Sequence, residues 1–75
     1  MLNRKEKFKF EVLRSDYDAV EKIIDEYEDQ GKIKVIDVLT VVRDRYWTTT
    51  ITVFATEADF RDMYFELRKE WLLMW

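Results

Sequence analysis

The chain has no cysteine, no histidine and no proline, and only one glycine among its 75 residues. Without cysteine or histidine, disulfides, thiolate nucleophiles, imidazole bases and ordinary zinc sites are excluded. The lack of proline and the single glycine leave no linker, so we expect one domain over residues 1–75. The only serine is assigned below to a helix start, and no glycine-rich phosphate loop occurs. We therefore expect no catalytic residues, no cofactor and no metal.

Long apolar runs and a strong charge of either sign are also missing. No apolar stretch is long enough to span a membrane, and the basic start "MLNRKEKFKF" lacks the apolar core of a signal peptide. We therefore expect a soluble, cytoplasmic protein without a membrane partner. The net charge of -3 argues against a general nucleic-acid binder, for which a basic balance is expected.

What the chain does have is a 48% apolar and 16% aromatic composition, which is rich for its length. The segment "KFKFEVLR" alternates strictly between apolar and polar residues, the period of a half-buried strand. The segments "KIKVIDVLTVVRD" and "RYWTTTITVFAT" are dense in strand-forming residues and predict one long hairpin. With residues 44 and 45 in the loop, Val42 lies opposite Trp47, and pairing continues through Thr40 with Thr49, Val38 with Ile51 and Ile36 with Val53.

Two helices are predicted from capping signals and helical spacing. Ser15 with Asp18 resembles a capping box before a helix from Asp16 to Gln30, which Gly31 would end in a left-handed conformation. Thr56 with Asp59 repeats the signature before a second helix, which runs from Glu57 to near the C-terminus. An apolar stripe of Phe60, Met63, Tyr64, Leu67, Trp71 and Met74 follows that helix.

The predicted order of strand, helix, strand, strand, helix defines an α+β protein. It resembles a ferredoxin-like split βαββα fold without its last strand, with a three-stranded antiparallel sheet and two helices packed on one face. The resemblance places the first strand at the centre of the sheet. It is a likeness of topology that carries no motif, so it implies no particular function.

Strand periodicity divides the sheet into a core face and a second face. The core face is predicted to hold Phe8, Phe10, Val12, Ile36, Val38, Val42, Trp47, Ile51 and Val53. The second face mixes polar residues with Ile33, Val35, Leu39, Val41, Tyr46 and Phe54, although a solvated face should be cleanly polar. Either these are ordinary exposed apolar residues or a second copy covers them.

The C-terminal "EWLLMW" is apolar around most of the helix circumference. It could plug the core, contact a partner or anchor to a membrane surface, and we favour a partner contact. Together with the second face of the sheet, it supplies the residues expected to mediate self-association as a homodimer. These are Leu39, Val41, Phe54, Trp71, Leu72 and Trp75.

The strands are basic and the helices acidic, and residues 15–31 hold seven acids against one base. Four acids follow one side of the first predicted helix at three- or four-residue spacing: Asp18, Glu21, Asp25 and Glu28. This acidic stripe costs helix stability through repulsion between like charges. It is either a solvated face or a partner-binding surface aimed at a basic groove; a metal site is disfavoured because helical carboxylates do not converge.

These features predict a small, non-enzymatic protein-binding or regulatory module, homodimeric, that occupies the surface of an unidentified partner protein. The compact acidic chain is similar in type to the short accessory proteins with which phages and mobile elements inhibit host machinery. One alternative is a single-stranded nucleic-acid-binding module that uses Arg43, Arg45 and Tyr46. Another is a designed or purely structural assembly protein, since proline, cysteine and histidine are absent and both helices carry capping signals.

Overall fold

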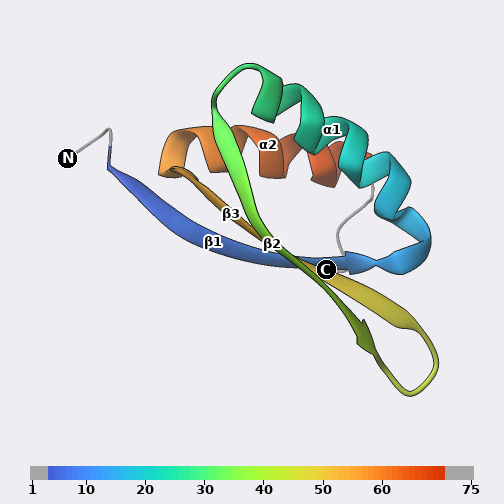
Figure 1. The fold of residues 1–75 in the computed structure, drawn as a ribbon. Coiled ribbons are helices and arrows are strands. Elements are labelled where there is room, and N and C mark those ends of the chain that lie inside the picture. The colour runs from blue at the N-terminus through green and yellow to red at the C-terminus, as the bar shows by residue number, and fades with distance from the viewer. Residues whose placement is uncertain (1–3, 71–75) are drawn as a thin grey trace.

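A computed structural model describes residues 4–70 and shows a small α+β fold with an antiparallel sheet and two helices on one side of it (Figure 1). The α+β class and the order of strands and helices are confirmed. Among the described residues, no helix is long and apolar enough to cross a membrane. The elements are β1 (Lys5–Leu13), a 3-10 turn η1 (Arg14–Asp16), α1 (Tyr17–Asp29), β2 (Ile33–Val42), β3 (Trp47–Thr56) and α2 (Glu57–Lys69).

The sheet has the order β1-β3-β2, and both strand pairs are antiparallel. The expected central position of the first strand is therefore wrong: β3 is central, and β1 and β2 are the edges. The composition of the strands explains this order. Most of β3 consists of small or β-branched residues that are buried on both faces of the sheet. In β1, by contrast, every second residue is charged, and lysine is one of the residues that protect sheet edges from further pairing.

The hairpin follows the predicted register only in its outer part. Val42 pairs with Trp47, and Val38 pairs with Ile51, as expected. A β-bulge between Val35 and Asp37 then shifts the strand by one residue. Val53 therefore pairs with Val35, and the predicted pairing of Ile36 with Val53 is wrong. A one-residue shift moves all side chains before the bulge to the opposite face of the sheet.

The bulge corrects the predicted division of the faces. Ile33, placed on the second face by sequence, is buried in the core, and Val35 packs against it, whereas Ile36 is exposed. Val38, Val42 and Trp47 were also predicted to be in the core, and all three are exposed. Their side of the sheet was correctly assigned from the register, but the helices do not extend over this end of the hairpin (Figure 1).

The core lies between the helices and the covered face of the sheet. Phe60 of α2 connects the two layers, since its ring stacks on Phe8 at 4.3 Å between centroids and meets Phe10 at 6.0 Å. Such aromatic pairs bury large areas and stabilise beyond burial alone. The buried core residues are Phe10, Val12, Val20, Ile24, Ile33, Ile51, Val53, Ala55, Met63 and Leu67.

The helix ends agree with the sequence at two of three signals. The hydroxyl of Thr56 accepts a hydrogen bond from the Asp59 N–H at 3.2 Å, and Gly31 has a φ of 74° at the end of α1. The capping box at Ser15 is wrong, because Ser15 lies inside the 3-10 turn and no side chain caps α1. Trp71, Leu72 and Trp75 lie outside the described residues, so their expected role in self-association stays a prediction.

Candidate interaction surface

The outer end of the β2–β3 hairpin exposes apolar and aromatic side chains. The Arg43 N–H donates to the Tyr46 carbonyl at 2.8 Å, which closes a tight turn at Asp44 and Arg45. Next to this turn, the exposed fractions are 65% for Val42 and 57% for Trp47. Exposure of several large apolar residues together is a feature of protein interaction sites rather than of ordinary surface. In the strand register, Val38, Val42 and Trp47 lie on the side of the helices, and Leu39 lies on the second face. We call the exposed residues on both faces of this end the hairpin surface: Val38, Leu39, Val42, Tyr46 and Trp47.

The hairpin surface is exposed because β2 and β3 extend beyond the end of β1 and beyond the helices. β1 ends at Leu13, which pairs with Thr48, so Trp47 has no neighbour on that side within the sheet. The chain then turns into α1, which covers the opposite end of β2 (Figure 1). The sequence alone contains part of this information, since the predicted hairpin is longer than the first predicted strand.

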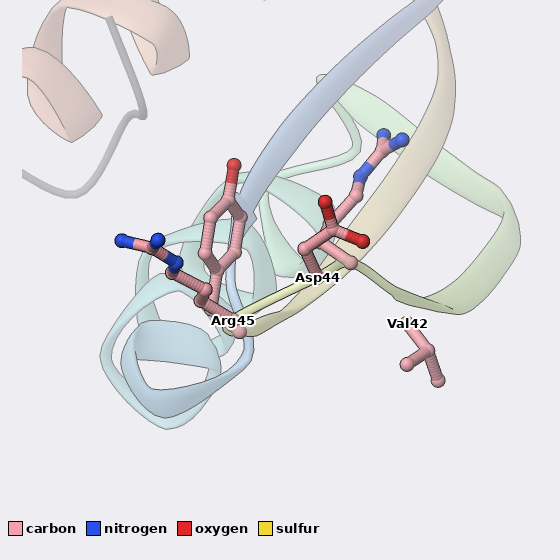
Figure 2. Close-up of a pocket in the computed structure, with 5 residues that line it drawn as sticks. Val42, Asp44 and Arg45 are labelled. Atoms are coloured by element: carbon pink, nitrogen blue, oxygen red, sulfur yellow. The ribbon is translucent and has the colours of Figure 1, made fainter.

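The turn itself forms an open hollow lined by five consecutive residues, Val42, Arg43, Asp44, Arg45 and Tyr46. Figure 2 shows the side chain of Val42 pointing away from those of Asp44 and Arg45. Asp44 adds a negative charge between the two arginines that were predicted to bind nucleic acid. Arg43 is moreover held by Glu11, with its Nη2 2.6 Å from Oε2. The three residues predicted to bind nucleic acid are therefore neighbours, but the charge of Arg43 is paired with that of Glu11. Arg45 and Tyr46 are left as a cationic and an aromatic side chain, with Asp44 next to them in the sequence.

A polar cluster on the second face joins β1 and β3 to the hairpin turn. Glu11 of β1 accepts hydrogen bonds from the Thr48 hydroxyl of β3 and from Arg43, which directly follows β2. The hydrogen bond from Thr48, followed by that from Arg43, holds the pKa of Glu11 below its ordinary value of 4.5. The cluster was not predicted, because Glu11 and Arg43 are separated by 32 residues and only the strand order brings them together.

We expect Glu11 to make the free energy of unfolding depend on acid pH. Its pKa is lower in the folded than in the unfolded chain, so the folded protein binds fewer protons. The stabilisation is complete above the unfolded pKa and is lost as the pH falls through the folded pKa. The test is urea unfolding at pH values from about 3 to about 7, a range that includes the titration of carboxylates. The free energy of unfolding should fall less steeply toward acid pH in Glu11→Gln than in wild type. Glu6→Gln, at an exposed position of the same strand, serves as the control and should keep the wild-type slope.

The acidic stripe lies along the edge of the sheet formed by β2. All four of its residues are exposed, as predicted, and three of them border a hollow between α1 and β2. Glu28 has a structural role as well, since its Oε2 accepts the Val35 N–H at 3.1 Å. Burial, followed by a hydrogen bond to Glu21, raises the pKa of the Tyr17 phenol in the same region. Within residues 4–70, no three carboxylates are grouped as metal ligands.

The described residues expected to mediate self-association lie on the second face. Leu39 is 57% exposed on β2, and Val41 on the same strand is half-buried. Phe54 of β3 is paired in register with Lys7 on one side and Lys34 on the other, so it lies between two basic edges. Leu39 belongs to the hairpin surface and Val41 is close to it, whereas Phe54 is near the opposite end of β3.

Sequence reasoning missed Val42 and Trp47 as surface residues and Ile36 as an exposed one. The alternation of apolar residues correctly assigns the first two to one side of the sheet, but it cannot show where the helices end. The bulge at Ile36 has no glycine or other local signal in the sequence.

Comparisons of the chain with models of known protein families, with curated proteins and with solved structures found no match. The fold itself defines the class: a small α+β protein with an open three-stranded antiparallel sheet and two helices. The hairpin surface, the edge of β2 and the acidic stripe are the features of that fold from which its function can be argued.

Proposed function

We propose that this protein is a non-enzymatic binding module that acts by occupying a surface of another protein, with the hairpin surface as its contact. The observation that carries the proposal is the exposure of Trp47 and Val42 beside Tyr46 at the end of the hairpin. Exposed tryptophan and tyrosine side chains are the residues that most often dominate the energy of protein interfaces. The two-stranded support holds their backbone in place, which lowers the entropy lost on binding.

The fold supports a ferredoxin-like assignment within this proposal. In the order β1-β3-β2, the strands on either side of α1 in the sequence are separated by β3, which is the arrangement of a split βαβ unit. This topology hosts many unrelated functions, so it does not select a partner. A short acidic chain that covers a surface on another protein fits an accessory inhibitor of the phage or mobile-element type, and the acidic stripe would favour a basic surface on its target.

The proposed function is tested by immobilising this protein and capturing its partners from a lysate of the cells that carry its gene. Each captured candidate is then purified and titrated against the protein to measure the affinity. Trp47→Ser combined with Tyr46→Ser should reduce the affinity roughly a hundredfold, since each removes an exposed aromatic contact residue. Phe65→Ser is the matched control, because Phe65 is 53% exposed on α2, away from the hairpin. It should retain wild-type affinity.

Two outcomes would contradict the proposal. One is a captured protein that binds wild type and the hairpin variant equally, which would move the contact elsewhere. The other is tight, salt-dependent binding of single-stranded RNA that disappears in Arg45→Glu, which would favour the nucleic-acid alternative. Far-UV circular dichroism of every variant must first show the wild-type fold.

A further inference from the structure

We propose that the free edge of β2 pairs antiparallel with β2 of a second copy, in the register that places Thr40 opposite Thr40. The pairing would join two three-stranded sheets into one six-stranded sheet around a twofold axis. It goes beyond the proposed function, because it requires no other protein and is built on backbone pairing along the edge of the hairpin.

The two edges of the sheet differ in their fitness for pairing. Charged side chains alternate along β1, which protects that edge. β2 is ten residues long, contains no proline, and carries only Lys34 and Asp37 as charges. In the first half of β2, one backbone N–H of the edge already has a partner, since Glu28 of α1 accepts the Val35 N–H. The bulge at Ile36 interrupts the strand there, so the regular, open part of the edge begins at Asp37.

The hydrogen bond that closes the hairpin turn shows which backbone groups face this open edge. The Arg43 N–H points toward β3, where it meets the Tyr46 carbonyl. Backbone groups alternate along an antiparallel strand, so those of Val38, Thr40 and Val42 point away from β3. A second β2 centred on Thr40 meets these three residues with its own three outward residues. Every outward N–H and carbonyl in this stretch then finds a partner.

The side chains match in the same register. Asp37 lies opposite Arg43 of the second copy, which makes an ion pair at both ends of the seam. Between these ends, Leu39 lies opposite Val41, and Val38 lies opposite Val42. A shift of the second copy by two residues in one direction places Asp37 opposite Val41, and in the other it places Leu39 opposite Arg43. Only the register centred on Thr40 pairs both charges and keeps apolar side chains together.

Arg43 can bind the carboxylate of Asp37 from the second copy while it keeps its hydrogen bonds to Glu11. Its Nε and Nη2 donate to Glu11, at 3.3 Å and 2.6 Å from Oε2. Among residues 4–70, its Nη1 has no hydrogen-bond partner, and a guanidinium carries five donors in a fixed plane. Glu11 therefore holds the Arg43 side chain on the second face of the sheet, which is also the face of Asp37.

The other face offers a second match between the copies. The hollow between α1 and β2 is bordered by Val38 and by Glu21, Asp25 and Glu28 of the acidic stripe. In the proposed register, the exposed Val42 of the second copy lies beside Val38 at this hollow. The turn that follows brings Arg45 of the second copy toward the acidic stripe. The apolar hollow and the acids beside it are thus complementary to the hairpin end of another copy of the chain.

The first measurement is the mass in solution by light scattering coupled to size exclusion. Wild type is expected at twice the chain mass of 9.3 kDa. Asp37→Lys places two cations opposite each other and should raise the dimer dissociation constant roughly tenfold or more. Asp29→Lys is the matched control, with the same change of charge at an exposed position at the end of α1, and should remain dimeric. Thr40→Pro removes an outward N–H, which an edge strand tolerates, and should be a folded monomer.

The register is tested directly with a single thiol, since the chain has no cysteine of its own. Opposed residues in a hydrogen-bonded antiparallel pair have Cα atoms about 5.5 Å apart, within the range of a disulfide. Thr40→Cys should therefore form a covalent dimer rapidly under mild oxidation. Leu39→Cys places its two thiols on diagonal positions and should crosslink much more slowly.

The proposal is overturned if wild type remains monomeric at millimolar concentration. It is also overturned if a dimer forms that Asp37→Lys and Thr40→Pro leave intact, or if the two cysteine variants crosslink at equal rates. None of these results depends on binding to another protein, so they are separate from the test of the proposed function.

Discussion

Ile51→Ala is expected to leave this protein close to the limit of folding. Ile51 is 1% exposed at the middle of the central strand, where it pairs with Phe10 on one side and Val38 on the other. Truncation of a buried isoleucine to alanine costs about 2–5 kcal/mol, because transfer energy is lost and a cavity remains. A domain of this length has a total stability of about 4–11 kcal/mol, so the loss is a large fraction of it.

The measurement is urea unfolding followed by far-UV circular dichroism at one fixed chain concentration, because self-association would make the midpoint depend on concentration. Ile51→Val is the graded control and should cost about 0.5–1.5 kcal/mol at the same site. Thr50→Ala, on the second face, should have a smaller effect than either. A cost below about 1 kcal/mol for Ile51→Ala would mean that the cluster around Ile51 is not the core of the protein.

Thr49→Val is expected to have the opposite effect and to stabilise the protein. Thr49 is 1% exposed on the covered side of β3, and its hydroxyl oxygen has no hydrogen-bond partner among the described residues. A buried polar group without a partner costs about 1–3 kcal/mol. Valine has nearly the same shape and a high preference for strands, so the replacement should raise the free energy of unfolding by about 1 kcal/mol.

Thr49→Ser is the control for this prediction, since it keeps the hydroxyl and removes the methyl group. It should destabilise the protein, because buried apolar contact is lost without relief of the unpaired oxygen. Thermal and urea unfolding of the three proteins should rank valine above threonine above serine. If valine is less stable than threonine, the hydroxyl has a partner in solution that compensates its burial.

Several local features could be predicted from the sequence because neighbouring residues determine them. Gly31 ends α1 with a positive φ, which glycine adopts at no steric cost. Thr56 caps α2 because a threonine oxygen can reach an N–H three residues later. The tight turn after Val42 was located without any glycine, because Asp44 and the arginines beside it form a run of three charged residues between two strand-forming segments.

The candidate site was predicted only in part. The four acids of the acidic stripe are exposed as expected, since a run of charges on one side of a helix cannot be buried without partners. The position of the stripe beside the edge of β2 was not predicted. The cluster of Glu11, Thr48 and Arg43 was missed as well, because it needs residues of β1, β3 and the hairpin turn, and the order of the strands in the sheet was unknown.

Periodicity, capping and turn preferences act over a few residues, so the helices, the strands and the turn between β2 and β3 follow from the amino-acid sequence. The central position of β3, the bulge at Ile36 and the extension of Val42 and Trp47 beyond the helices follow only from the packing of the whole chain. These features depend on how long each layer is and which strands are neighbours. Alternation assigns a side chain to one side of a sheet, but only packing decides whether another layer covers it.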